Sequence, residues 1–406
     1  MKILFLTENF PPETNAAATR VFERALYWIN AGHGVTVITC APNFPQGALF
    51  AGYQNRWHQT EHMSGIKVVR VKTFISANRG VIRRSLDFLS FGIMGFVAGL
   101  FQPRPDIVAA TSPQFFAAVA GWAISACRRL PFIFELGDLW PNSIAAVGAM
   151  KKGVLLNLVE KFELFLYRRS TRVAALTHAF KRNLINRGIN EDKIDVVLNG
   201  VDLPRYAPQP RDDSLAEEWR LQGKFVIGYV GTHGMAHGLI NVLDAAEKLQ
   251  DRDDIRFLLA GAGAEREMLV ATAEQKSLNN VVFLPMQPKE KMPAVWSLCD
   301  VALVHLKDSP AFAEVIPSKI FEAMAMGLPI LLSVPDGEAR EIVDGHQAGL
   351  WVPPENPESL ADAVKNLCDD PNLKDQFAAN ALAAAADHSR SVQANEMIAV
   401  FEKALQ

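Results

Sequence analysis

The sequence predicts an α/β protein with two doubly wound domains, each built on a parallel sheet. Short apolar segments alternate with amphipathic helical segments along the chain, which is typical of parallel sheets covered by helices on both faces. The length of 406 residues suits two domains better than one hydrophobic core. A polar, proline-rich segment at residues 203–214 lies between the halves, and we expect the chain to change domain there.

The expected strands are short, buried apolar runs. In the first half they are Ile3–Thr7, Val35–Cys40, Val68–Thr73, Ile107–Thr111, Phe132–Leu136, Val173–Thr177 and Val196–Asn199. In the second half they are Phe225–Val230, Ile255–Ala260, Val281–Leu284, Val301–His305, Pro329–Ser333 and Leu350–Val352. An alanine-rich tail predicts further helices, so we expect domains at residues 1–205 and 206–386, with a last helical segment at 387–406. Functional residues should follow strands, because doubly wound sheets bind ligands at the carboxyl ends of their strands.

Charge is divided unevenly between the two halves, although the whole chain has a net charge of −3. Residues 1–205 hold 24 Lys and Arg against 14 Asp and Glu, whereas residues 206–406 hold 17 against 30. A basic first half favours an anionic partner, either a membrane surface or a phosphorylated substrate, although attraction between the domains would also explain it. Because no basic and aromatic stripe accompanies the charge, we expect no nucleic acid partner.

The four cysteines are widely scattered, with no paired Cys or His spacing. This pattern argues against a zinc site or a disulfide framework and indicates a reducing, cytoplasmic location. The first apolar run meets Glu8 too early for a signal peptide, so we interpret it as a buried strand.

The segment from Glu314 to Leu332 carries the clearest functional pattern. Pro317 cannot lie in a helix interior, so it separates Glu314 on a loop from Glu322 within a helix. Pro317 and Ser318 suit a helix start, with a hydroxyl that can cap it, and such a start is a natural anion site. Lys319 opposes the helix dipole, so we expect its charge to serve a bound phosphate. Glu322 could accept hydrogen bonds from a sugar diol, and the segment therefore predicts a site for a phosphorylated sugar.

The two glutamates and the following EAMAMGLPIL resemble the nucleotide-sugar motif of retaining family 4 glycosyltransferases, which have the two-domain GT-B fold. The resemblance implies that Glu314 approaches the transferred sugar and that Glu322 binds the ribose. It also implies that the last helix, at Ser391–Leu405, crosses back to the first domain. The segment from Gly32 to Tyr53 resembles the branch of this family that builds bacterial O-antigen, colanic-type exopolysaccharide and capsule.

Loops after strands of the second half complete the expected donor site. The glycine-rich turn that holds Gly231, Thr232 and His237 can cradle a diphosphate on backbone N–H groups. The family resemblance implies an arginine and a lysine in this region, but the chain has neither between Phe225 and Glu247. In this chain, either Lys319 and backbone N–H groups alone bind the phosphates, or His237 contributes to binding them. The resemblance further implies that the loops at Gly261 and Pro285 lie near the base.

The first half offers two charged candidates. Arg20 follows the first strand and is expected to contact a phosphate or the acceptor, or else to be a solvated helix charge. Asp138 follows a buried strand and is the best polar candidate for catalysis in this half, or else caps the next helix. Many family members have His-Asp where this chain has Gly137-Asp138. We expect no metal ion, because the Asp251-Arg252-Asp253 triplet is typical of a solvated turn.

A membrane contact is expected at residues 88–102, which hold no charge and are bracketed by arginines. This stretch is too short to span a bilayer comfortably, but it could lie in the interface or be a buried core helix.

The resemblance covers nearly the whole chain and implies a retaining glycosyltransferase. The expected donor is a nucleotide diphosphate sugar, UDP-linked and carrying an N-acetylated amino or deoxy sugar, with no tightly bound cofactor. The expected acceptor is a polyprenyl diphosphate-linked or other glycan at the cytoplasmic face of the inner membrane. Two alternatives stay open from the sequence: a GT-B nucleotide-sugar epimerase and a non-catalytic nucleotide-sugar-binding subunit.

Overall fold

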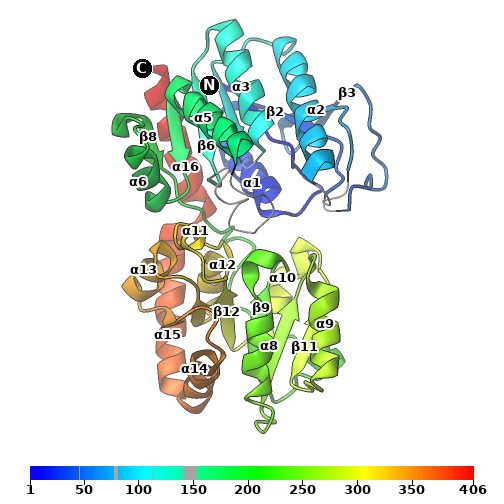
Figure 1. Cartoon of the computed structure of the whole chain (residues 1–406), viewed down its shortest axis with the longest axis vertical. Helices are drawn as coiled ribbons and strands as arrows, with labels where there is room; N and C mark the ends of the chain where they lie inside the picture. The colour runs from blue at the N-terminus through cyan, green and yellow to red at the C-terminus, as the bar shows by residue number, and fades with distance from the viewer. Residues whose placement is uncertain (45, 77–80, 113, 140–152) are drawn as a thin grey trace. The chain divides into compact units, whose positions relative to one another are not determined.

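The computed structural model describes residues 1–44, 46–76, 81–112, 114–139 and 153–406, and the chain forms two compact units. Unit 1 comprises Met1–Asn199 and Arg390–Gln406, and unit 2 comprises Gly200–Ser389. Each unit is a sheet with helices packed against it, and the two can be followed by colour in Figure 1. The α/β fold class with two parallel-sheet domains is confirmed.

Unit 1 contains an eight-stranded sheet in the order β3-β4-β2-β1-β5-β6-β7-β8. The strands are β1 (Lys2–Leu6), β2 (Gly34–Cys40), β3 (His58–Met63), β4 (Ile66–Val71), β5 (Ile107–Thr111), β6 (Phe132–Leu136), β7 (Arg172–Ala175) and β8 (Ile194–Val196). All neighbouring pairs are parallel except β3 and β4, which run antiparallel. The carboxyl ends of the parallel strands therefore lie along one edge of the sheet.

Helices cover both faces of the unit 1 sheet, because successive apolar residues of each strand point to opposite sides. The helices are α1 (Ala16–Asn30), α2 (Val81–Leu100), α3 (Phe115–Arg128), α5 (Val154–Arg169), α6 (His178–Asn186), η1 (Glu191–Lys193) and α16 (Arg390–Leu405). Ile3 and Phe5 of β1 share a core with α1 and α16. On the other side, the backbone of Gly95 in α2 approaches Leu6.

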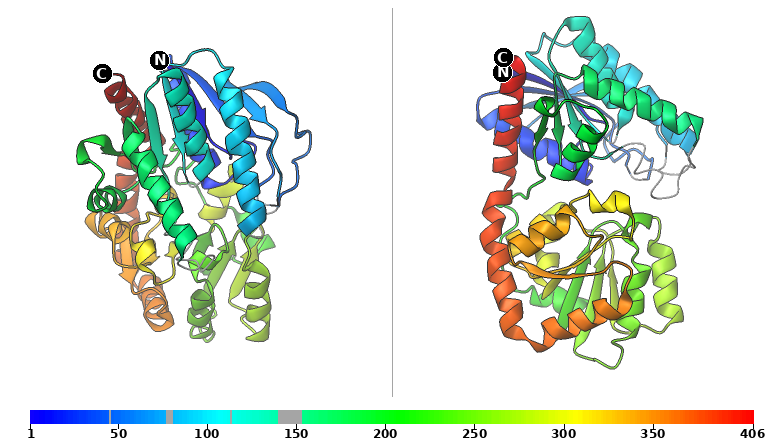
Figure 2. Two further views of the ribbon diagram at one scale, coloured as in Figure 1. Left: turned by 45° about the horizontal axis from the view of Figure 1, so that its top comes forward. Right: turned by 60° about the vertical axis from the view of Figure 1, so that its left-hand side comes forward.

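The C-terminal helix α16 belongs to unit 1 and lies beside its sheet (Figure 2). The indole N–H of Trp28 in α1 donates to the carbonyl of Ala394 at 3.0 Å. The rings of Trp28 and Phe401 meet edge to face with centroids 5.3 Å apart. The last sixteen-residue helix therefore completes the hydrophobic core that the first residues of the chain begin.

Unit 2 contains a six-stranded, fully parallel sheet in the order β11-β10-β9-β12-β13-β14. The strands are β9 (Phe225–Val230), β10 (Ile255–Ala260), β11 (Val281–Leu284), β12 (Val301–His305), β13 (Ile330–Ser333) and β14 (Gly349–Val352). The helices are α7 (Asp213–Glu218), η2 (Met235–His237), α8 (Ile240–Glu247), α9 (Arg266–Gln275), η3 (Lys289–Lys291), α10 (Met292–Ser297), α11 (Pro310–Ala313), α12 (Lys319–Met326), α13 (Glu338–Gly345), α14 (Pro357–Asp369), α15 (Pro371–Ala384) and η4 (Ala385–His388). Helices α8, α9 and α14 share one apolar core with the sheet.

Two strands differ from the expectation: β8 shares only Val196 with the expected Val196–Asn199, and β3 falls on no expected strand. β3 lies at the edge of the sheet, and its residues alternate between exposed and half-buried. Its sequence, HQTEHM, therefore needs no apolar run, and no strand was expected there. Within the described ranges, no helix is both long and apolar enough to cross a bilayer.

Candidate functional site

Helix α12 begins where the sequence predicts, but its start is not capped as expected. Ser318 occupies the position before the helix with φ −60° and ψ −23°, and its hydroxyl makes no capping hydrogen bond. The capping expectation was wrong because the backbone of Ser318 is already helical, whereas a capping residue is normally extended. The first turn is instead closed by Ile320 N–H, which donates to the carbonyl of Pro317 at 3.1 Å.

Lys319 lies in the first turn of α12, and its amine is buried. The side chain is 9% exposed, and Nζ has no hydrogen-bond partner among the described residues. The amine instead lies 3.5 Å from the centroid of the Tyr229 ring, which is a cation–π distance. Burial lowers the pKa of Lys319 to about 7, and the carboxylate of Glu322 only partly opposes this.

Two glycines bring the loops that follow β9 and β10 into direct contact above Lys319. Gly231 has φ +145° and Gly261 has φ +151°, values that favour glycine. A Cβ at Gly261 would lie 1.8 Å from the carbonyl oxygen of Gly231, and a Cβ at Gly231 would lie 3.0 Å from Nζ of Lys319. A larger residue at Gly261 would require the two loops to move apart, and one at Gly231 would require the amine of Lys319 to shift.

The residues after Gly231 fold back over the ring of Tyr229. The hydroxyl of Tyr229 donates to the carbonyl of Thr232 at 2.8 Å, and the N–H of His233 donates to the carbonyl of Ala262 at 2.9 Å. The sequence did not single out His233, although it stands in the same glycine-rich run as Thr232. These bonds fix the loop through its backbone, with Thr232 exposed and the ring of His233 fully buried.

Histidines line the same region. Burial, reinforced by the charge of Lys319, lowers the pKa of His237 to about 3. Burial also lowers the pKa of His233 to about 4, with Arg266 and Lys319 acting in the same direction. His305 at the end of β12 places Nδ1 2.6 Å from the carbonyl of His237 and Nε2 3.2 Å from the side-chain amide oxygen of Asn241. All three imidazoles are therefore neutral near pH 7.

The structure brings most of the donor-site candidates together at the carboxyl edge of the unit 2 sheet. Lys319, Gly231 and Gly261 are in contact, and the charge of Lys319 acts on His237. Glu322 lies on the same helix as Lys319, half-buried, and accepts a hydrogen bond from the indole N–H of Trp296 at 3.2 Å.

Two further candidates lie in neighbouring loops of unit 2. Glu314 follows α11 and is half-buried. Pro285 is exposed, directly after Leu284, whose carbonyl accepts from the N–H of Gly261 at 3.0 Å. The roles of all these residues stay predictions.

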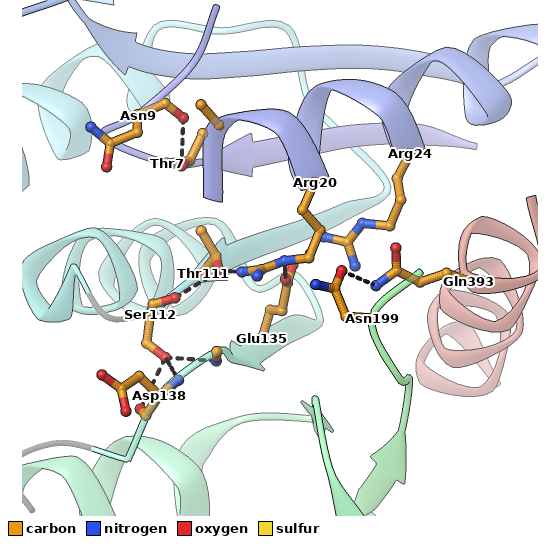
Figure 3. A network of polar contacts seen from close by, with 12 residues as sticks. Thr7, Asn9, Arg20, Arg24, Thr111, Ser112, Glu135, Asp138, Asn199 and Gln393 are labelled. Carbon is orange, nitrogen blue, oxygen red and sulfur yellow. Dashed lines mark hydrogen bonds and ion pairs between the residues drawn. The ribbon is translucent and has the colours of Figure 1, made fainter. Parts of the chain in front are cut away.

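Arg20 of unit 1 lies in a buried ion pair. It reaches from α1 toward β5 and β6 (Figure 3), where Nε donates to Glu135 at 2.8 Å and Nη2 donates to Thr111 at 3.2 Å. Arg24 donates to the other oxygen of Glu135 at 2.5 Å. Burial raises the pKa of Glu135, but the two arginines outweigh it and hold the pKa below its usual value. Because two guanidinium groups share one carboxylate, positive charge remains at this end of the sheet.

Glu135 and Arg24 were not among the expected site residues. The available signal was a single charged residue inside the otherwise apolar strand FIFEL. Such a residue is almost never buried unless it is paired.

The backbone at Gly137 packs too tightly for the histidine that many members of the resembled family have there. The N–H of Gly137 donates to the hydroxyl of Ser112 at 2.9 Å. A Cβ at this position would lie 2.6 Å from the carbonyl of Ser112 and 3.0 Å from Nη2 of Arg20. Asp138 is half-buried, and its N–H lies 3.3 Å from the same hydroxyl (Figure 3). The expected cap by Asp138 concerns residues 140–152, which lie outside the described residues.

No group of three or more His, Cys, Asp or Glu side chains suited to a metal ion occurs in the described part of the chain. The Asp251–Asp254 turn instead forms ion pairs. Asp253 pairs with Lys224 and Arg256, each at 2.9 Å, and Arg252 pairs with Asp254 and Asp369, each at 2.8 Å.

Two family models together match most of the chain. Residues 15–200 match the glycosyl transferase 4-like domain, and residues 211–383 match glycosyl transferases group 1. The putative colanic acid biosynthesis glycosyl transferase WcaI of Escherichia coli K12 is 25% identical, over 90% of this chain and 91% of its own. The GDP-mannose-dependent alpha-mannosyltransferase of Mycobacterium tuberculosis is 26% identical, over 90% of this chain and 88% of its own.

Solved structures of glycosyltransferases share the fold along the whole chain. Sucrose-phosphate synthase from Thermosynechococcus elongatus superposes with a TM-score of 0.80 at 17% identity, covering 99% of this chain and 98% of its own. The Anabaena protein HepE in complex with UDP superposes with a TM-score of 0.72 at 20% identity, covering 98% of each chain. With both units matched, the chain is a glycosyltransferase of the GT-B fold, built from a glycosyl transferase 4-like domain and a group 1 domain.

Proposed function

We propose that this enzyme is a retaining glycosyltransferase that moves a sugar from a UDP-linked donor to a polyprenyl diphosphate-linked glycan during surface polysaccharide synthesis. The donor half of this proposal rests on the amine of Lys319, which lies beside Gly231, is buried and has no hydrogen-bond partner among the described residues. Two relatives support the rest: WcaI is named for colanic acid biosynthesis, and HepE has been solved with UDP. The transferred sugar is proposed to be an N-acetylated amino or deoxy sugar.

The proposed donor site divides the work between helix α12 and the loops. Lys319 and the loop at residues 231–234 stabilise the negative charge that develops on the departing diphosphate. Glu322 accepts hydrogen bonds from the ribose hydroxyls, and Thr232 and His237 border the phosphates. Pro285 and the Gly261 loop face the base.

The chemical step requires two bonds to change at the anomeric carbon. The bond from this carbon to the phosphate oxygen breaks, and its electron pair stays with the diphosphate. The acceptor hydroxyl oxygen bonds to the same carbon on the same face, and its proton passes to the departing phosphate oxygen. Glu314 is proposed to hold the transferred sugar, while Asp138 and Arg20 of unit 1 serve the acceptor.

An exposed apolar stripe along helix α2 supports a membrane-bound acceptor. The stripe consists of Leu86, Leu89, Ile93, Val97 and Leu100, which are between 37% and 56% exposed, and Phe101 beyond the helix is 85% exposed. The same helix buries Phe91 and Ala98 against the sheet side, so it is amphipathic rather than wholly a core helix.

Basic residues and a groove accompany this stripe. Arg83, Arg84 and Arg104 flank it and are exposed. An apolar groove of about 300 Å³ lies beside it, lined in part by Trp57, Met94 and Phe101. Apolar side chains that enter the interface and cations that meet anionic headgroups together favour peripheral binding at the cytoplasmic face.

A thermal-shift titration tests the donor half first, because a ligand that binds only the folded state raises the melting temperature. UDP, GDP, CMP and NAD are added separately to the wild type, to Glu322→Ala and to Glu341→Ala, an exposed glutamate of α13 that serves as the control. We expect UDP to stabilise the wild type and the control but not Glu322→Ala. Stabilisation by GDP alone would mean that the donor carries guanine rather than uracil. No response to any nucleotide would contradict the proposed pocket.

Transfer is then measured with radiolabelled UDP-sugars and a polyprenyl diphosphate-linked sugar in detergent. The anomeric configuration of the product, read by NMR, tests retention. An inverted product would contradict the front-face mechanism while leaving the transferase activity intact. Consumption of donor without any acceptor would instead favour an epimerase.

A further inference from the structure

Several nitrogen atoms close to Lys319 in unit 2 are buried without a partner among the described residues. They are Nζ of Lys319, both ring nitrogens of His233 and Nδ1 of His237, and none has a hydrogen-bond partner among the described residues. His233 is fully buried, and its Nε2 lies 3.3 Å from the place that a Cβ on Gly261 would occupy. A buried polar nitrogen without a partner is unfavourable, so several of them close together favour an anion that enters among them.

His305 differs from these two histidines because each of its ring nitrogens has a polar neighbour. Its Nδ1 lies 2.6 Å from the carbonyl of His237, and its Nε2 lies 3.2 Å from Asn241. Both nitrogens of His305 therefore already face polar protein atoms, whereas both nitrogens of His233 and Nδ1 of His237 have no hydrogen-bond partner among the described residues. The side chains that surround the two open histidines from neighbouring elements are Tyr229 of β9, Arg266 of α9, His305 of β12, and Lys319 and Glu322 of α12.

Without a ligand, this pocket favours uncharged side chains. The pKa of His237 is lowered to about 3 and that of His233 to about 4, in both cases by burial first and then by neighbouring cations. The pKa of Lys319 is lowered to about 7 by burial. Glu322 is the one acid that acts on Lys319, and it acts in the opposite direction. The empty pocket is thus poorer in positive charge than its residue types suggest.

We propose that a diphosphate enters this pocket together with protons, which His233, His237 and Lys319 take up, and that His233 is a further diphosphate ligand. This inference rests on the proposed donor site. The anion supplies the missing acceptors and favours the charged form of each side chain. Because the chain has no Arg or Lys between Phe225 and Glu247, these protons supply positive charge that fixed cations would otherwise provide.

The sign of the pH dependence follows from this uptake. Between the pKa of a group in the free protein and its higher pKa in the complex, the complex holds more protons than the free protein. Donor affinity therefore falls as pH rises, by about tenfold per pH unit for each proton taken up. Below the free-state values the groups are charged before binding, and this part of the dependence disappears.

Isothermal titration calorimetry of the full chain measures the uptake directly. UDP-glucose and, separately, GDP-mannose are titrated at pH 7.0 and 8.5 in buffers that differ in ionisation enthalpy. The diphosphate of these diesters does not titrate near neutral pH, so any proton exchange belongs to the protein. We expect an uptake of about one proton or more, and a dissociation constant that is at least about tenfold weaker at pH 8.5.

Three variants separate the histidines from a general pH effect. His237→Arg places a guanidinium there, which stays charged at pH 8.5, and it should bind more tightly than the wild type at that pH, with less uptake. His233→Gln keeps a polar side chain but cannot take up a proton, so its uptake should also fall. His346→Gln is the control, since His346 follows α13 and contacts His388 outside the pocket.

The outcomes distinguish this inference from the function on which it rests. Binding of a nucleotide sugar with no proton uptake at either pH, or with uptake unchanged in both His233→Gln and His237→Arg, overturns the inference and leaves the donor site standing. If neither nucleotide sugar binds at any pH, the donor site and the inference both fail.

Discussion

The amine of Lys319 lies 3.5 Å from the centre of the Tyr229 ring, in a pocket where it has no hydrogen-bond partner among the described residues. The aromatic face offsets part of the cost of burying this amine, but it offers no acceptor for the three N–H bonds. Lys319 is thus held in a position that suits a bound anion better than it suits the empty protein. Residues kept in an unfavourable state commonly mark functional sites.

Lys319→Met tests this conflict between stability and function. The variant should lose stabilisation by UDP, because the buried positive charge is gone. The ligand-free protein should be as stable as the wild type, or more stable by about 1–3 kcal/mol, because a buried amine without a partner is replaced by an apolar group of similar length. Urea denaturation with and without UDP measures both quantities.

Lys365→Met is the matched control on the surface of unit 2, where the lysine side chain is 44% exposed. This variant should change the unfolding free energy by less than about 0.5 kcal/mol, and its response to UDP should equal that of the wild type. Retained UDP binding in Lys319→Met would show that the amine does not serve the phosphates.

Gly261→Ala tests the contact between the two loops. The added Cβ would lie 1.8 Å from the carbonyl of Gly231, and the backbone φ of +151° disfavours alanine in any case. We expect a loss of about 1–3 kcal/mol in unfolding free energy and weaker UDP binding. In Gly345→Ala, the control, no atom lies within 4 Å of the new Cβ, and the change should be neutral or stabilising.

Glu135→Gln tests the pair of arginines at the end of the unit 1 sheet. Removing the carboxylate leaves Arg20 and Arg24 buried without their counter-ion, and we expect a loss of about 3–5 kcal/mol. Chemical denaturation at pH 7 measures the loss, with the exposed Glu402→Gln as control. A loss below about 1 kcal/mol would mean that the two guanidinium groups find other partners.

The same pair has a defined pH dependence. Because the pKa of Glu135 is lower in the folded protein, its stabilising contribution is present above the unfolded value, near about 4.3, and is lost as pH falls through the folded value. As pH falls from the unfolded pKa to the folded pKa of Glu135, the difference in unfolding free energy between wild type and Glu135→Gln should shrink. A difference that stays constant down to the folded value would contradict the ionised pair.

Ile93→Asp tests the proposed membrane face. This residue is 56% exposed within the apolar stripe of α2, so the substitution should leave the melting temperature nearly unchanged. Co-sedimentation with vesicles that contain anionic lipid should fall about tenfold or more, because an apolar contact is replaced by a charge of the wrong sign. Leu405→Asp on α16 is the control, at 43% exposed and outside the stripe. Equal binding by both variants would remove α2 from the membrane interface.

Most strands could be predicted because buried parallel strands are continuous apolar runs. The strand at 58–63 could not, since it lies at the sheet edge and is polar along its whole length. The donor-side residues follow strands and carry recognisable turn chemistry, so the sequence indicates them. The pairing of Glu135 with Arg20 and Arg24 joins residues more than a hundred positions apart, and no local pattern specifies it. The crowding at Gly137 likewise depends on the backbone of a neighbouring loop, at Ser112.

Helix α16 has a consequence for synthesis of the chain on the ribosome. Met397 and Phe401 fill the core around Trp28, so unit 1 lacks part of its interior until the final residues have emerged. Unit 2 is one continuous stretch and has all of its own residues earlier. The N-terminal unit, although translated first, is therefore the last to be completed, and α1 must wait with an apolar face uncovered while unit 2 folds. Termination of translation before α16 would therefore harm unit 1 more than unit 2.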